Sequence, residues 1–190
     1  MEKANLKDLG VPSAARCYEI LHEFAVPPHI VAHGEMVARV ALVVARALKE
    51  AREKVDLALV EAAGLLHDLT KHRSLLTGEN HAETAARELE KLGYPRVATV
   101  VAQHVFLQPG PPSHPIREEE IVYYADKRVR HTQIVSLKER FEDLRARYGR
   151  STTSLIRLYR LEEMTRLLER RLFKKLPFDP EDVRILVYET

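Results

Sequence analysis

The chain has 190 residues and a mass of 21.8 kDa, with 45% hydrophobic and 31% charged residues, enough for one domain with a real core. The formal net charge of +2 is too small to indicate a nucleic-acid-binding protein, and the single cysteine, Cys17, excludes an intramolecular disulfide and a thiolate metal site. No apolar run reaches the roughly 18 residues that a membrane span needs, and Met1-Glu2-Lys3 does not resemble a secretion signal, so no membrane partner and a cytoplasmic location are expected.

In the first half of the chain the hydrophobic residues repeat with helical spacing. After Pro27-Pro28, apolar residues from Val37 to Leu48 recur at i, i+3, i+4 and i+7, which predicts an amphipathic helix. Residues 57–69 are apolar nearly throughout, so they predict a central, buried helix. The turn cluster at 77–80 predicts a new helix from His81 to Gly93, followed by another from Pro95 to about Val105.

The second half is also predicted to be helical, after a loop at 109–115 that contains four prolines and one glycine. Helices are expected at 118–130, 135–148 and 152–175, whereas 178–190 has no clear pattern. With no convincing strand, the sequence predicts an all-α protein of about seven or eight helices. We expect a domain over residues 1–150 and a C-terminal helical extension over 151–190, whose leucines pack on the domain or on a second copy of the chain to form a homo-oligomer.

Several other charged and aromatic residues are expected to lie at the surface or in the core without a role in the site. The arginines and lysines between 128 and 150 interleave with acidic residues, so they are expected to form a solvated helix face. Arg73 and Lys127 are likewise expected at the surface, and His114 is expected to be exposed in the proline-rich loop. Of the neighbours Tyr123 and Tyr124, whichever points inward is expected to pack in the core.

Histidine and aspartate residues recur in apolar surroundings, and this is the pattern that carries chemistry. A buried carboxylate is costly unless a cation or hydrogen-bond donors compensate it. Imidazole nitrogens with carboxylate oxygens are ligands of Mn, Fe, Co, Ni or Zn, and a set without thiolates favours a catalytic site with open positions. A single histidine in such a place is more often a structural residue than a metal ligand. The evidence for a metal site is therefore the occurrence of several such residues in a fixed order along the chain. The set consists of His33, His67, Asp68, His81, His104 and Asp126.

This order resembles the HD-domain metal-dependent phosphohydrolase superfamily, whose pattern is a His, a His-Asp pair and a distant Asp on helices. Residues 67–71, His-Asp-Leu-Thr-Lys, are similar to the family's His-Asp-Ile-Gly-Lys motif, with Leu and Thr in place of Ile and Gly. Residues 125–127, Ala-Asp-Lys, are similar to the motif that closes the pattern. The resemblance runs from His33 to Asp126 and implies the helical HD-domain fold.

The resemblance also implies a ligand set. His33, His67, Asp68 and Asp126 would bind one metal ion, and Asp68 would bridge to a second ion completed by the two remaining histidines, His81 and His104. Many members carry two consecutive histidines where this chain has His104-Val105, and a valine cannot be a ligand. The expected cofactor is therefore a divalent transition metal, with one or two ions per chain left open and Mg also compatible.

The resemblance implies a hydrolase that uses metal-activated water on a phosphoester or phosphoanhydride bond of a small substrate, with a nucleotide expected. Asp68 would orient the water, and Lys71 would contact the phosphate unless it is an ordinary lysine at a helix end. His72 is expected beside the substrate. The alternatives are a non-catalytic module that binds a nucleotide or a partner, an RNA phosphodiesterase, which the small net charge disfavours, and a di-iron oxygenase.

Overall fold

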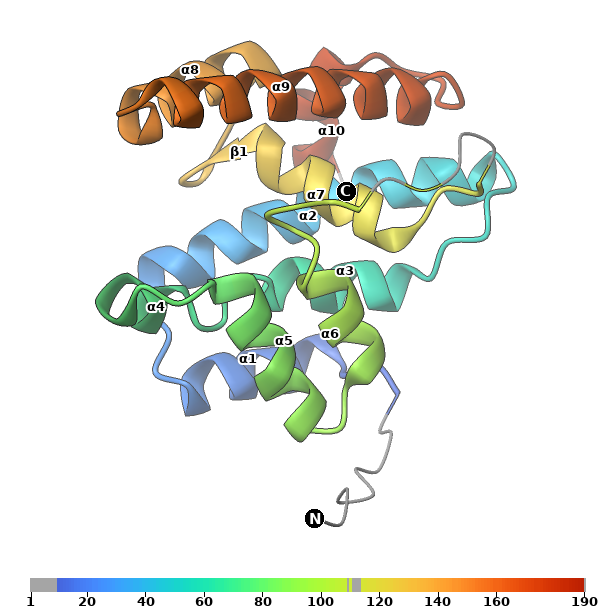
Figure 1. The fold of residues 1–190 in the computed structure, drawn as a ribbon. Helices are drawn as coiled ribbons and strands as arrows, with labels where there is room; N and C mark the ends of the chain where they lie inside the picture. Colours follow the sequence, from blue (N-terminus) through green and yellow to red (C-terminus); the bar gives the residue numbers. More distant parts are fainter. Residues whose placement is uncertain (1–9, 109, 111–113, 190) are drawn as a thin grey trace.

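The computed structural model describes residues 10–108, 110 and 114–189, and these are all-α apart from one short hairpin (Figure 1). The all-α prediction is confirmed. The ten α-helices of the described residues exceed the expected seven or eight because three short ones, α1, α4 and α10, had no clear signal. The helices are α1 (Ala14–Glu23), α2 (Pro28–Glu50), α3 (Leu57–Leu66), α4 (Lys71–Thr77), α5 (His81–Lys91), α6 (Pro95–Val101), α7 (Glu118–Arg128), α8 (Leu137–Tyr148), α9 (Thr152–Phe173) and α10 (Val183–Glu189).

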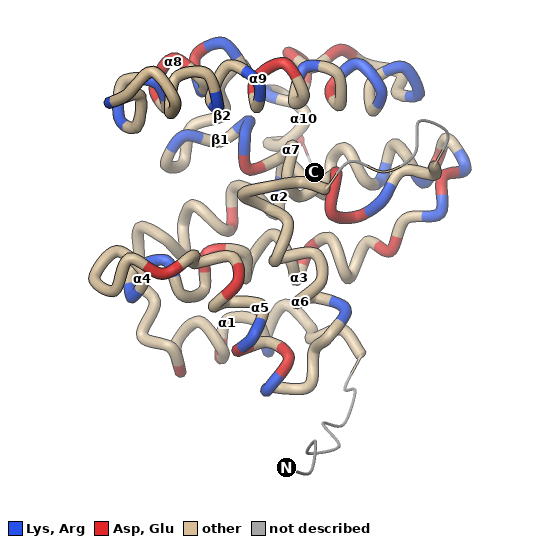
Figure 2. The backbone as a smooth tube through the Cα atoms, in the orientation of Figure 1, with Lys and Arg blue, Asp and Glu red and all other residues tan. Residues whose placement is uncertain are grey.

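Helices α2 and α3 form the centre of the fold. Helix α3 is apolar on nearly all sides and packs against α1, α2, α6 and α7, which explains why its sequence lacks a polar face. In Figure 2 the charged residues lie mainly on the outer helices, and they are densest on α8 and α9. The predicted central position of the 57–69 segment is therefore confirmed, and this helix leads directly into His67 and Asp68.

Two glycines let α2 and α3 approach each other closely. A Cβ atom added to Gly64 would lie 2.7 Å from the Cα of Ala38, and one added to Gly34 would lie 2.8 Å from the carbonyl oxygen of Leu65. These distances are too short for any side chain, so each helix presents a bare backbone position to the other. The close contact fixes the relative position of His33 on α2 and His67 after α3.

Replacing Gly64 with alanine should destabilise the protein, although alanine normally stabilises a helix interior relative to glycine by about 1 kcal/mol. The new methyl group would press on the backbone of Ala38, and we expect a net loss of about 1–3 kcal/mol of unfolding free energy in urea denaturation. An unchanged or raised urea midpoint would mean that α2 and α3 can separate at no cost.

Of the helices that end earlier than their sequences predict, α3 and α6 end next to a histidine of the predicted set. Helix α3 ends at Leu66, four turn residues follow, and α4 begins at Lys71. Helix α6 ends at Val101, which leaves His104 in a turn. In each case the imidazole Nδ1–H of the histidine donates to a carbonyl in the last turn of the preceding helix. The side chain thus takes part in the helix termination, which apolar periodicity does not reveal.

The C-terminal helices form a separate layer over α7. Helices α8 and α9 lie side by side across α7 in Figure 1, and both contact it. Helix α7 ends at Arg128, not at residue 130, because β1 (Val129–Arg130) pairs with β2 (Gln133–Ile134) in an antiparallel hairpin. The unpatterned segment 178–190 contains a 3₁₀ turn at Pro180–Asp182 and helix α10, which packs on α2.

Some predictions fall partly outside the described residues. Within the predicted loop at 109–115, residues 110, 114 and 115 have no regular structure, and 109 and 111–113 are not described. Residues 1–9, with the N-terminal Met1-Glu2-Lys3, and residue 190 are likewise outside the described part. No helix in the described part combines the length and apolar character that crossing a membrane requires.

Three of the residues predicted at the surface are buried or partly buried. Arg128 and Lys127 have 0% and 7% exposure because α8, α9 and the C-terminal segment cover the end of α7. The His114 side chain is only 14% exposed and lies 3.0 Å from a carboxylate oxygen of Glu120. Arg73, in contrast, is exposed as predicted.

Candidate metal centre

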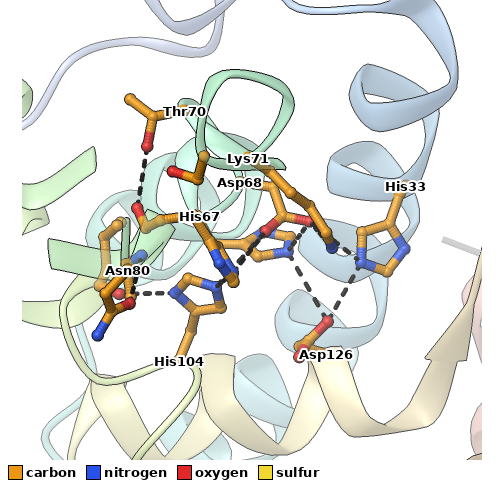
Figure 3. Close-up of polar contacts among 12 residues, drawn as sticks. His33, His67, Asp68, Thr70, Lys71, Asn80, His104 and Asp126 are labelled. Carbon is orange, nitrogen blue, oxygen red and sulfur yellow. Dashed lines mark hydrogen bonds and ion pairs between the residues drawn. The ribbon is translucent and has the colours of Figure 1, made fainter. Parts of the chain in front are cut away.

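The structure brings the six predicted ligands into one buried cluster (Figure 3). They come from five places in the chain: helix α2, the turn after α3, the first residue of α5, the turn after α6 and the last turns of α7. Five of the six are buried, and the His81 side chain is 26% exposed. The residues in that order are His33, His67 with Asp68, His81, His104 and Asp126.

Asp68 divides the cluster into two groups, because each of its carboxylate oxygens faces a different pair of histidines. Its Oδ2 atom lies 3.4 Å from Nε2 of His67 and 3.9 Å from Nε2 of His33. Its Oδ1 atom lies 3.4 Å from Nε2 of His81 and 3.5 Å from Nε2 of His104. A carboxylate in this position can bridge two cations, one on each side.

Asp126 completes the first group. Its Oδ1 atom lies 3.2 Å from Nε2 of His33 and 3.8 Å from Nε2 of His67. The ligand atoms of His33, His67 and Asp68 lie within 4.8 Å of one another, and Asp126 adds a second carboxylate beside the two histidines. This donor set suits a divalent transition metal and leaves room for water.

The second group has the spacing of ligands that share one ion. The Nε2 atoms of His81 and His104 are 3.1 Å apart. Two nitrogens bound to one ion at 2.0–2.1 Å, with bond angles between octahedral and tetrahedral, lie roughly 2.9–3.4 Å apart. Val105 lines the adjoining cavity and supplies no donor, so Asp68 Oδ1 and two histidines are the protein donors on this side.

Backbone carbonyls orient the three buried histidine rings. In each, Nδ1–H donates to a carbonyl oxygen at 2.7–2.8 Å, which leaves Nε2 as the ring nitrogen that faces the cluster and can bind a metal. Such partners are the usual outer contacts of metal-binding histidines. The pairs are His33 with His131, His67 with Gly64, and His104 with Val101.

Two buried atoms of the cluster have no hydrogen-bond partner among the described residues, namely Nε2 of His67 and Oδ1 of Asp68. A buried acceptor left unpaired is costly, and here the two face the centre of the cluster. A cation in the first group would satisfy Nε2 of His67, and one in the second group would satisfy Oδ1 of Asp68. The residues present therefore fit a divalent metal site.

The charges in the cluster also fit this role. Burial would raise the pKa of Asp68, but His67 and Lys71 outweigh it and hold the carboxyl well below its usual range. Burial, together with the nearby His104, lowers the pKa of His81 to about 4. At neutral pH the aspartate is therefore ionised and the His81 ring neutral, which are the protonation states of metal ligands.

Two lysines contact the cluster from opposite sides. Lys71 donates to Asp68 Oδ2 at 2.6 Å, and its side chain is 36% exposed. Lys127 donates to Asp126 Oδ2 at 2.6 Å and to the His104 carbonyl at 2.9 Å. The expectation that Lys127 is a surface charge is thus wrong, because its neighbour in the chain is a buried carboxylate that needs a cation.

A cavity of about 520 Å³ opens over the cluster. Asp68, Lys71, His81, His104 and Asp126 lie on its wall. His72 is not among the lining residues, because adjacent residues of a helix point in different directions. The opposite wall belongs to α8 and α9 and was not predicted, since its residues look like ordinary positions on charged helices. They are Arg140, Leu144, Tyr148, Ser154, Arg157, Leu158 and Leu161.

Comparison with known proteins adds a family and a relative. Residues 30–130 match the family model described as "HD domain". The chain is also 30% identical over 155 residues to the uncharacterized protein MJ0778 of Methanocaldococcus jannaschii. The aligned region covers 74% of this chain and 90% of that protein. No solved structure matches the chain. The family match contains all six residues of the cluster but ends before α8 and α9.

Proposed function

Because the chain belongs to the HD domain family, we propose that it is a hydrolase of phosphoester or phosphoanhydride bonds in a small substrate. The family generally includes metal-dependent phosphohydrolases. One observation carries the proposal: at the floor of the cavity, the two oxygens of Asp68 face two separate groups of donors. Paired cations at such a position suit phosphoryl transfer, in which an attacking oxygen and a leaving oxygen must both be stabilised.

When bound, divalent metal would lower the pKa of a water molecule to about 7 and neutralise charge on the phosphoryl oxygens. The protein residues hold and orient the reactants. Asp68, ionised and fixed between the two histidine groups, can accept a hydrogen bond from the attacking water. Lys71 lies on the cavity wall with part of its side chain exposed, so it can donate to a phosphoryl oxygen.

The proposed reaction adds water across one phosphorus–oxygen bond. The water oxygen forms a bond to phosphorus, the bond to the leaving oxygen breaks, and that oxygen takes a proton. The products are inorganic phosphate, or a shorter phosphate ester, and an alcohol or phosphate. No oxidant or reductant is needed, which distinguishes this reaction from oxygenase chemistry on the same fold.

The test begins with elemental analysis of the purified protein, followed by a phosphate-release assay. The metal-free protein would be loaded separately with Mn, Co, Ni, Fe, Zn or Mg and offered nucleotides and simple phosphomonoesters. We expect one or two bound transition metal ions per chain and release of phosphate that depends on them. Tight binding of a nucleotide by the loaded protein without any release would instead favour a regulatory module. A metal-dependent redox reaction would favour an oxygenase.

His81 provides a test of the second donor group. Replacing it with alanine should reduce the bound metal from two ions per chain to one, because only His104 and a shared carboxylate oxygen would remain on that side. Elemental analysis and metal titration would measure this. As a matched control, His22 lies on α1, away from the cavity, and its replacement with alanine should leave the metal content unchanged. One ion in the natural protein and in the His81 variant would rule out the two-ion arrangement.

A further inference from the structure

Beyond the six ligands, the cavity has a wall on α8 and α9 that the family match does not include, and this wall carries a largely covered arginine. Arg140 belongs to α8, lines the cavity, and has a side chain that is only 14% exposed. Its Nη1 donates to Asp143 at 3.3 Å, and its Nε is buried with no partner among the described residues. A guanidinium has five N–H donors, and the one hydrogen bond that Arg140 makes among the described residues leaves other Nη–H groups able to donate to a ligand.

The other basic side chains on the cavity wall each contact another side chain, and of them Lys71 keeps donors that can reach a phosphoryl oxygen. Lys71 and Lys127 each pair with a carboxylate of the cluster. Arg157 is exposed, and its guanidinium stacks on the ring of Phe106 at 4.1 Å from the centroid. Arg140 is thus the largely covered arginine that α8 adds to this wall, with one side-chain partner among the described residues.

Arg140 is also close enough to the cluster to act on its charges. Burial would raise the pKa of Asp126, but several cations outweigh it, with Lys127 the strongest and Arg140 among the others. An anion bound between the cluster and α8 would therefore meet positive charge on both sides. Arginine suits a phosphate group there because its planar fork can donate two parallel hydrogen bonds.

The rest of this wall is largely apolar. The polar side chains that α8 and α9 add to it, besides the two arginines, are those of Tyr148 and Ser154. A sugar or polyol would leave most of its hydroxyl groups unpaired against such a surface, whereas an aromatic or aliphatic group would bury apolar area. The apolar residues that α8 and α9 add are Leu144, Leu158 and Leu161, and Val105 and Phe106 line the same cavity from the segment after α6.

We propose that Arg140 binds the substrate phosphate and that α8 and α9 hold an apolar or aromatic body, so that the substrate is a phosphomonoester of a mainly apolar molecule. This inference rests on the proposed function and names its substrate class. The arginine that α8 adds to the cavity suits one phosphate group, and Leu144, Leu158 and Leu161 suit an apolar body beside it.

The experiment uses the metal-loaded full chain with two probes, phenyl phosphate and glycerol 3-phosphate. Calorimetry measures the binding of each, and phosphate release measures turnover. We expect the natural protein to prefer phenyl phosphate, and Arg140→Gln to weaken its binding roughly 10- to 100-fold, the loss typical of a charge-assisted hydrogen bond. Arg140→Lys keeps the positive charge but not the planar pair of donors, so its affinity for phenyl phosphate should lie between those of the natural protein and Arg140→Gln.

Arg147→Gln is the matched control, because Arg147 is on the same helix and also pairs with Asp143 but does not line the cavity. It should bind phenyl phosphate normally, and all the variants should keep their bound metal. Unchanged binding in Arg140→Gln, loss of its metal, or a preference for glycerol 3-phosphate would overturn this inference while leaving the hydrolase proposal standing. If the loaded natural protein neither binds nor hydrolyses any phosphate ester, both proposals fail together.

Discussion

Replacing Asp68 with asparagine should remove the bound metal and reduce phosphate release at least about 100-fold, since even outer contacts of a metal site typically contribute 10- to 100-fold. Asparagine has nearly the same shape but no charge, and it presents an amide nitrogen to one of the two histidine groups. Both groups depend on this side chain, because one oxygen faces His33 and His67 and the other faces His81 and His104. The effect should therefore exceed that of losing either group alone.

Metal content and circular dichroism would separate loss of the site from loss of the fold. Asp56→Asn is a matched control, because Asp56 caps the other end of the same helix, α3, and asparagine is an equally good cap. It should keep full metal content and activity. If Asp68→Asn kept its metal and its phosphate release, Asp68 could not be the shared ligand, and the proposed centre would be wrong.

The sequence predicts the cluster because several of its members interrupt an apolar pattern. His67 and Asp68 follow a helix with no polar face, and a charge in such a place needs a partner nearby. Their order along the chain, with His33 before them and Asp126 after them, then matches a known family pattern. What the order could not show is how Asp68 divides its two oxygens, because that depends on the turn at residues 67–70.

The α8–α9 wall could not be predicted in the same way. Arg140 and Arg157 lie on helices rich in both charges, where an arginine is usually solvated. Both arginines line the cavity because of how α8 and α9 lie across α7. This packing joins segments far apart in the chain, and no local sequence pattern encodes it. The burial of Arg128 has the same cause, since its partners Glu169 and Pro180 lie more than thirty positions away along the chain.

Arg128 should be among the most important residues for stability, and its replacement with methionine should lower the unfolding free energy by about 3–5 kcal/mol, the usual loss when one partner of a buried ion pair is removed. Its side chain is fully buried. It donates to the carbonyls of Val135 at 2.7 Å and Pro180 at 3.0 Å, and to the hydroxyl of Tyr124 at 2.5 Å. It also lies 3.3 Å from a carboxylate oxygen of Glu169. Methionine would fill much of the space but leave these acceptors without a donor.

The same variant tests whether residues 151–190 behave as a separate extension. Glu169 and Pro180 belong to that segment, so Arg128 joins it to the end of α7, two residues after Asp126. If the chain unfolds as one unit, Arg128→Met should shift a single urea transition, and Arg130→Met, which replaces a side chain with one long contact to Gln133 at 3.4 Å, should change it by less than about 0.5 kcal/mol. Two resolved transitions would instead show that the C-terminal helices fold independently. The cavity wall that carries Arg157 could then be lost while the metal centre stayed intact, so the number of transitions also decides whether substrate binding and metal binding fail together on heating.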